Sequence, residues 1–141
     1  MPSPYQLTEN SDYSYEFTTY QGIKYSVYFL DYNWVFHKYS HLAHHNYTFN
    51  IDVIEGNANK VYTDERIGVT VAEIFRLFFD NTQNVAIYIC DSFDDRQSAR
   101  KKKFDFGFRK YNDGSILKED GVVNVENVEI LNSILIHKQK S

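Results

Sequence analysis

Residues 13–29, YSYEFTTYQGIKYSVYF, alternate between apolar and polar side chains on both sides of Gly22. Every second position carries an aromatic or branched residue: Tyr13, Tyr15 and Phe17, then Ile23, Tyr25, Val27 and Phe29. Successive side chains of a β-strand point to opposite faces, so a period of two around a glycine predicts a β-hairpin with one buried face. Other elements of the chain must therefore cover that face.

Several other segments predict strands. Residues 46–54, NYTFNIDVI, again place alternate apolar side chains on one face, and we expect a short strand before them at residues 34–36. Residues 84–90, NVAIYIC, form a continuous apolar run that is typical of a strand buried on both faces. Weaker strand patterns follow at residues 115–118 and 122–125, and the closing segment EILNSILIHK places three isoleucines on one side: Ile130, Ile134 and Ile136.

Two helices are predicted. A capping box of Thr70 and Glu73 predicts the start of the first helix. Apolar residues at helical spacing follow it: Val71, Ile74, Phe75 and Phe78. The second helix covers residues 94–111 and ends before Gly114, since glycine is common just after a helix. Its core-facing stripe is expected to be Phe104, Phe108 and Tyr111.

These elements predict an α+β domain in which two helices pack on a mainly antiparallel sheet, made of an N-terminal meander and later strands. A chain of 141 residues is long enough to bury its own core as a single domain over residues 1–141. We expect residues 1–12 to be loosely ordered.

The sequence favours a cytoplasmic protein. Cys90 is the single cysteine, so no disulfide can form within the chain. The N-terminus lacks the basic start and apolar stretch of a signal peptide. No apolar run approaches the roughly 18 residues of a membrane-spanning helix, so we expect no membrane contact.

The second predicted helix carries most of the positive charge. Residues 96–110 have a net charge of +6, whereas the whole chain has −4. On a helix, Phe106 points away from the expected core, beside a stripe of cations: Arg96, Arg100, Lys103 and Lys110. Cations around an exposed ring are used to bind single-stranded nucleic acid. The alternative is a solvated face whose aliphatic stems cover apolar surface.

Three carboxylates lie where a predicted buried strand meets this helix: Asp91, Asp94 and Asp95. Hard oxygen ligands at such a position can hold Mg²⁺. Helix capping by Ser92 or Asp94 explains them more simply, because acidic residues in the first turn complement the helix dipole. We therefore predict no metal and no cofactor, with these carboxylates as the candidates if Mg²⁺ binds.

Two further features have chemical alternatives. His37, His41, His44 and His45 would partly align on a helix and could then ligate Zn²⁺, but their flanks indicate strand and turn. A polar loop or strand end is the favoured interpretation. Cys90 ends the apolar run, and we expect it to be buried and free rather than a nucleophile.

Three parts of the chain resemble an uncharacterised family of short bacterial proteins, found mainly among Bacteroidota. They are the hairpin of residues 15–27, the run Ile87–Ser92 with Asp95-Arg96-Gln97 and Ala99-Arg100, and residues 134–138. The segment CDS…RQ…AR is the most specific part of the resemblance. It implies a cytosolic stand-alone domain with no known activity, and it favours four residues as a site: Asp91, Arg96, Gln97 and Arg100. Alternatively, Arg96 or Arg100 pairs with Asp91 or Asp94 and locks the strand to the helix.

We therefore hypothesise an interaction domain without enzymatic activity, which binds a macromolecular partner through the helix of residues 94–111. The expected binding residues are Asp91, Arg96, Gln97, Arg100, Lys103, Phe106 and Lys110. A protein partner or self-association is favoured, and nucleic acid is the alternative. In that alternative the chain binds nucleic acid or is a Mg²⁺-dependent nuclease of the toxin or defence type, with the three carboxylates on the metal.

Overall fold

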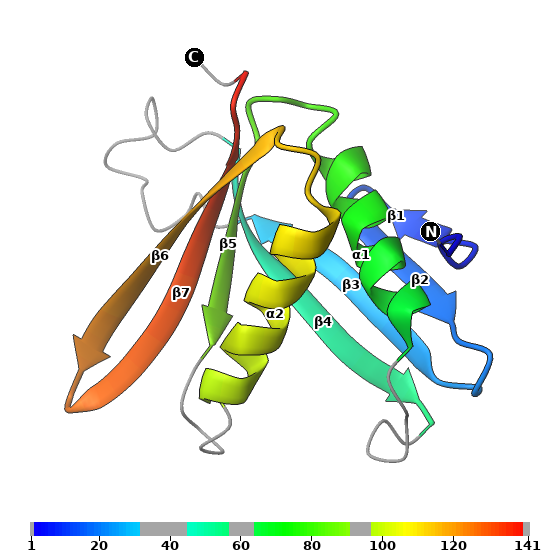
Figure 1. The fold of residues 1–141 in the computed structure, drawn as a ribbon, viewed down its shortest axis with the longest axis horizontal. Coiled ribbons are helices and arrows are strands. Elements are labelled where there is room, and N and C mark those ends of the chain that lie inside the picture. Colours follow the sequence, from blue (N-terminus) through cyan, green and yellow to red (C-terminus); the bar gives the residue numbers. More distant parts are fainter. Residues whose placement is uncertain (1, 32–44, 57–63, 91–96, 140–141) are drawn as a thin grey trace.

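The computed structural model describes residues 2–31, 45–56, 64–90 and 97–139. Within these residues, seven strands form one sheet and two helices accompany it (Figure 1). The strands are β1 (Thr8–Ser11), β2 (Ser14–Thr18), β3 (Lys24–Asp31), β4 (Asn46–Glu55), β5 (Val85–Cys90), β6 (Ile116–Val125) and β7 (Val128–His137). The helices are α1 (Glu65–Phe78) and α2 (Gln97–Tyr111). The order across the sheet is β1-β2-β3-β4-β5-β7-β6.

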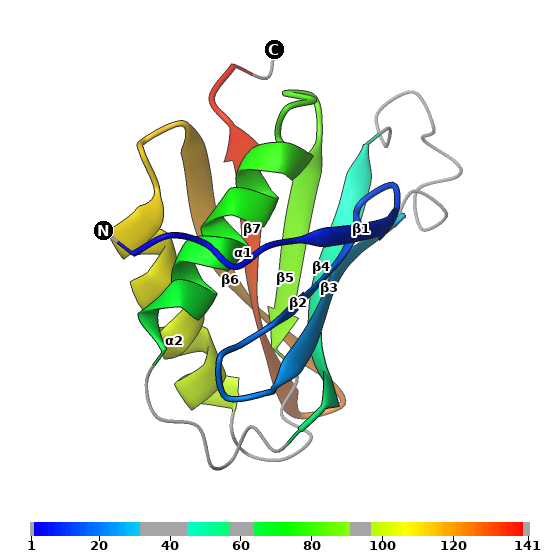
Figure 2. The same cartoon turned by 90° about the vertical axis from the view of Figure 1, so that its right-hand side faces the viewer.

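Both helices lie on the same face of the sheet, which confirms the predicted α+β class (Figures 1 and 2). Neighbouring strands are antiparallel except β4 and β5, which pair in parallel through Asn46–Thr48. Parallel neighbours need a crossover connection, and α1 supplies it on the covered face. In Figure 1, β4 and the β6–β7 hairpin diverge, and α2 lies in front of the opening between them.

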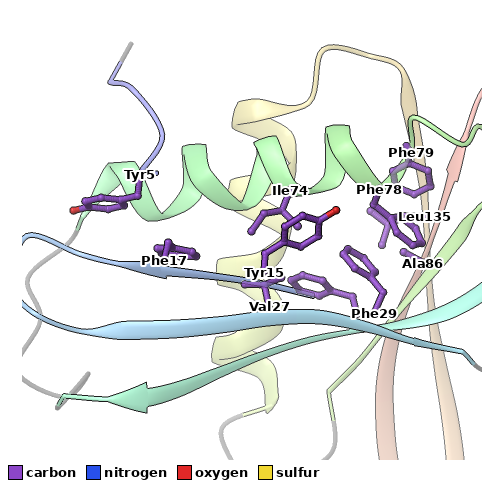
Figure 3. Packing of buried hydrophobic residues seen from close by; sticks show 11 residues of the cluster. Tyr5, Tyr15, Phe17, Val27, Phe29, Ile74, Phe78, Phe79, Ala86 and Leu135 are labelled. Atoms are coloured by element: carbon purple, nitrogen blue, oxygen red, sulfur yellow. The ribbon is translucent and has the colours of Figure 1, made fainter. Parts of the chain in front are cut away.

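The apolar face of the predicted hairpin forms the core. The buried side chains of the sheet include Tyr15, Phe17, Val27, Phe29 and Phe49. Ile74 and Phe78 point from α1 toward them (Figure 3). Phe78 stacks on Phe29 with ring centroids 3.9 Å apart and planes within 7°. Such aromatic pairs are favoured beyond their buried area, so this contact fixes α1 on the sheet.

Helix α1 begins at Glu65, so the capping box predicted at Thr70 is wrong. Asp64 is the N-cap, and its carboxylate accepts a hydrogen bond from the backbone N–H of Arg66 at 2.9 Å. Thr70 lies inside the helix, where its hydroxyl donates to the Arg66 carbonyl at 2.6 Å and accepts from the N–H of Tyr5 at 2.8 Å. Asp and Thr are both suitable caps, and in the structure Asp64 is the cap while Thr70 contacts the distant Tyr5.

The N-terminal segment contacts the rest of the structure at two places. β1 pairs with β2, and the segment before it passes across α1 (Figure 2). Tyr5 is buried there, stacked on Phe17 at 5.9 Å between ring centroids, with the Arg66 guanidinium 3.9 Å from its ring centroid. The buried ring of Tyr5 therefore joins the segment before β1 to the core.

The C-terminal strands form one long hairpin. The two weak patterns at residues 115–118 and 122–125 belong to a single strand, β6, because Gly121 continues the ladder opposite Asn132. Glu126 and Asn127 join it to β7 with φ of 51° and 68°, as a tight hairpin turn requires. The short strand predicted at residues 34–36 lies outside the described residues.

Gly68 allows the two helices to approach closely. A Cβ at this position would lie 2.6 Å from Cε2 of Tyr111 on α2. The Tyr111 hydroxyl also lies 3.2 Å from Oε1 of Glu65, to which it donates. The absence of a side chain at Gly68 therefore makes room for the Tyr111 ring.

We expect Gly68→Ala to destabilise the protein, although alanine is preferred over glycine in helices by about 1 kcal/mol. The new methyl group must displace the Tyr111 ring, and overpacking costs about 1–3 kcal/mol, so the expected net loss is about 1 kcal/mol. Gly107→Ala on α2 is the matched control: a Cβ there meets nothing within 4 Å, so it should raise the free energy of unfolding by about 1 kcal/mol. Urea unfolding measures both variants, and equal stabilisation would contradict the tight contact.

Candidate functional site

Helix α2 turns its aromatic stripe toward the sheet, as predicted. Phe104 stacks on Tyr88 of β5 with ring centroids 4.2 Å apart, and it lies 5.9 Å from Phe49. Phe108 also packs against the core. These rings fix the rotation of α2 about its axis and thereby decide which of its residues face solvent.

Phe106 lies on the opposite side of α2 and exposes 57% of its surface, as its helical position predicted. Lys102, Lys103 and Arg109 are exposed on this side, and they make no side-chain hydrogen bond or ion pair with the residues that the structure describes. Together with Lys110, these residues form what we call the α2 outer face. It presents an aromatic ring among cations.

Lys110 is held in place by α1. Its ammonium lies 2.8 Å from Oε1 of Glu65, 5.8 Å from the ring centroid of Phe106 and 5.5 Å from that of Tyr111. The hydrogen bond with Glu65 raises the pKa of Lys110 and lowers that of Glu65, so both groups are charged at neutral pH. Lys110 is therefore a positioned part of the α2 outer face, and the charge of Glu65 offsets its own.

A partly buried cluster of charged residues on the other side of α2 was missed by the sequence analysis. Lys101 is buried, and its Nζ donates to Asp105 Oδ1 at 2.7 Å and to Asp120 Oδ1 at 2.6 Å. Nζ of Lys118 lies 2.9 Å from Asp105 and 2.8 Å from Asp120, while the Ser133 hydroxyl donates to Asp120 at 2.6 Å. These residues, the Lys–Asp cluster, join α2 to β6 and β7. Only the i,i+4 spacing of Lys101 and Asp105 signalled it.

The cluster stays ionised at neutral pH. Burial alone would raise the pKa of Asp120, but hydrogen bonds from Lys101, Lys118 and Ser133 outweigh it and hold that pKa well below its usual range. Burial also acts to lower the pKa of Lys101, yet hydrogen bonds to Asp105 and Asp120 raise it overall. Because the folded-state pKa of Asp120 is depressed, its stabilisation is complete above its unfolded pKa of about 4 and is lost as the pH falls below that value.

The charge available to a partner is smaller than the sequence indicated. Lys101 is paired with Asp105 and Asp120, and Lys110 is paired with Glu65. The carboxylate of each pair offsets most of the lysine's field, and salt screens what remains beyond a Debye length of about 8 Å. Among the described side chains of α2, the unpaired cations are Lys102, Lys103 and Arg109.

An open cavity of about 530 Å³ lies between α2 and β6. Its lining residues are Asp105, Phe108, Arg109, Asn112, Gly114, Ile116, Leu117, Lys118 and Asp120. Asn112 is occupied within the fold, since its Oδ1 accepts from the N–H of Gly114 at 3.2 Å and its Nδ2 donates to the Ile116 carbonyl at 2.9 Å. Arg109 is the lining cation that has no partner among the described residues, so the cavity extends the α2 outer face.

The structure places three of the predicted binding residues on the α2 outer face: Lys103, Phe106 and Lys110. Gln97 and Arg100 lie in the first turns of α2, but their side chains are outside the described part of the structure. The other predicted residues, Asp91 and Arg96, lie outside the described residues, as do the magnesium candidates Asp94 and Asp95. The proposed Asp91–Arg96–Arg100 network therefore stays a prediction.

Cys90 ends β5 and is buried and free, as predicted. His37, His41 and His44 lie outside the described residues, whereas His45 precedes β4 with φ of 71° and its carbonyl accepts a hydrogen bond from Val85 at 2.8 Å. Metal binding by the histidines stays untested. In the described ranges, no helix is long and apolar enough to cross a membrane.

A family model described as a family of unknown function, DUF6169, matches residues 63–141. The match begins just before α1 and includes α2, the Lys–Asp cluster and the CDS…RQ…AR segment, whereas the β2–β3 hairpin lies outside it. No curated protein and no solved structure matches the chain.

Replacing Asp120 by Asn should lower the free energy of unfolding at pH 7 by about 1–2 kcal/mol. Charge-assisted hydrogen bonds are lost, but Asp120 is half exposed and solvent screens part of their effect. The variant should also lose less stability than the wild type between about pH 5 and pH 1, because the depressed pKa of Asp120 no longer contributes. Unfolding experiments at several pH values measure both effects.

Glu129→Gln on β7 is the control, because Glu129 is an exposed carboxylate with no ion pair among the described residues. Its stability curve should follow that of the wild type. If the pH dependence of Asp120→Asn ran parallel to the wild-type curve, the cluster would not be coupled to folding.

Proposed function

The chain belongs to this family of unknown function, so we propose its role from the α2 outer face alone. We propose a non-enzymatic interaction domain that uses this face to bind an acidic segment of a protein partner. The exposure of Phe106 among unpaired cations carries the proposal. The core does not need this ring, since Phe104 and Phe108 already make the inward contacts of α2.

Phe106 is suited to anchor a partner. Protein interfaces concentrate their binding energy in a few aromatic and arginine side chains that become desolvated at the centre. Here the exposed ring lies on the same side of α2 as Arg109, with the Lys110 ammonium 5.8 Å from the ring centroid. A partner that places an apolar side chain on the ring and carboxylates beside it would match both features.

The pairing of charges favours a protein over a nucleic acid. Nucleic-acid affinity depends on many simultaneous phosphate contacts. Lys101, Lys110 and Lys118 are paired with carboxylates, and the whole chain has a net charge of −4. A short acidic peptide needs fewer cations and gains from the exposed ring. The nuclease alternative depends on Asp91, Asp94 and Asp95, which lie outside the described residues.

We also propose a cytoplasmic location. Cys90 is the single cysteine of the chain, so the chain forms no disulfide of its own, and proteins without disulfides are typical of the cytoplasm.

The proposal is tested by fluorescence anisotropy with a short labelled peptide of glutamates around one leucine. The wild type should bind it, and the affinity should fall with added salt because exposed charges are screened. Phe106→Ala should weaken binding about tenfold by removing the anchor, and Lys103→Glu should do so by about the same factor by placing like charges together.

Lys138→Glu is the matched control, because it makes the same charge change at an exposed residue after β7, and it should bind like the wild type. Labelled single-stranded RNA of the same length is titrated in parallel. Tighter binding to RNA, lost in the same two variants, would replace our proposal by the nucleic-acid alternative. Binding of neither probe would overturn the assignment of function to the α2 outer face.

A further inference from the structure

The sheet has a second face, which neither helix covers (Figure 2). Paired residues of neighbouring strands share a face, so the register assigns the side chains on it. Over β5, β7 and β6 these side chains are mostly apolar. We call the following residues the apolar patch: Ile87, Ile89, Leu117, Val123, Ile130, Ile134 and Ile136.

Over β2, β3 and β4 the same face is mostly polar. Its residues there include Glu16, Lys24, Ser26, Tyr28, Thr48, Asn50 and Asp52, with Leu30 and Ile54 as apolar exceptions. Lys24 lies 3.6 Å from Glu16, and the Tyr28 hydroxyl donates to Asp52 at 2.7 Å. A polar outer face is typical of an antiparallel sheet in contact with water. The change from polar to apolar side chains at β5 therefore marks a part of this face that is less suited to contact with water.

The apolar patch is only partly covered in the single chain. Exposed fractions reach 44% at Ile89, 57% at Leu117 and 51% at Val123. The continuous apolar run of β5 predicted burial on both faces. At Ile89 this prediction is wrong for the single chain, because the residue is exposed. The other residues of the patch are partly buried, and patches of exposed aliphatic residues mark interaction surfaces. A second molecule would remove this surface from water.

The size of the patch suits a weak, reversible dimer. Strands lie about 4.8 Å apart and residues about 3.4 Å apart along them, so the ten residues of β6, the ten of β7 and the six of β5 span an area of roughly 420 Å². Two such patches would together bury roughly 850 Å², which is in the range of weak, transient interfaces. Glu119 is the charged residue of this region, and it stands on the edge strand β6, where it can reach solvent at the rim.

The side chain of Asn132 indicates which partner would cover the apolar patch. It lies between Ile89 and Gly121 in the register, and a Cβ at Gly121 would lie 2.9 Å from its Oδ1. Its amide makes no hydrogen bond with the residues that the structure describes. An amide both donates and accepts, so it can pair with a symmetry copy of itself, as a single asparagine does at a coiled-coil interface.

We propose that a second copy of this chain packs its apolar patch against the first, about a two-fold axis that passes Asn132. A two-fold contact places the same surface of both copies face to face, and it brings each residue near the axis to its own copy. The two asparagine amides then satisfy each other inside an apolar ring. The α2 outer face lies on the opposite side of the sheet, so both surfaces act independently.

Sedimentation velocity over a range of concentrations tests the proposal. The wild type should show a reversible monomer–dimer equilibrium with a dissociation constant in the micromolar range. Asn132→Asp keeps the shape of the side chain but places two like charges at the axis, so it should weaken the dimer at least tenfold. Val123→Glu, at a half-exposed position of the edge strand, should do the same without disturbing the monomer.

Ile54→Glu is the control, because Ile54 is 46% exposed on the same face but lies at the far end of β4. It should dimerise like the wild type, and circular dichroism should show the same fold in all variants. A wild type that stays monomeric at roughly 100 μM overturns the proposal. So does a dimer that persists in both test variants or that Ile54→Glu also abolishes.

Discussion

The stacking of Phe78 on Phe29 is the contact on which the arrangement of the helices depends. The rings lie 3.9 Å apart and join α1 to the centre of the N-terminal meander. Helix α1 then positions α2, because Phe75 meets Phe104 at 6.4 Å and Gly68 accommodates the ring of Tyr111. The orientation of the α2 outer face is therefore set by aromatic packing on the other side of the helix.

Ion pairs add to the aromatic contacts that hold α2 in place. Helix α2 has few apolar residues, so packing alone would hold it weakly. The Lys–Asp cluster adds charge-assisted hydrogen bonds between the helix and the β6–β7 hairpin, and Glu65 holds Lys110 from α1. The same pairing divides the cations of one helix into those that hold it in place and those that remain available to a partner.

Much of the fold could be predicted from local periodicity. The alternation around Gly22 identified the core-facing side chains of β2 and β3, and the helical positions of Phe104 and Phe106 identified the inner and outer faces of α2. The features that could not be predicted depend on contacts between residues that are far apart in the sequence. The place of Thr70 inside α1 could not be predicted from its neighbours, since its contact with Tyr5 spans 65 residues. The burial of Lys101 was missed for the same reason, since Asp120 lies on a strand beyond the helix.

The parallel pairing of β4 with β5 also determines the order in which the sheet can be completed. Strands β1 to β4 pair with near neighbours in sequence, so they can associate as soon as they leave the ribosome. The edge of β4 then stays open until α1 and β5 have been synthesised, which takes a few seconds at about 5–20 residues per second. An unpaired strand edge readily joins strands of other molecules. For this chain, translation speed between β4 and β5 thus sets how long a growing molecule is exposed to misassembly.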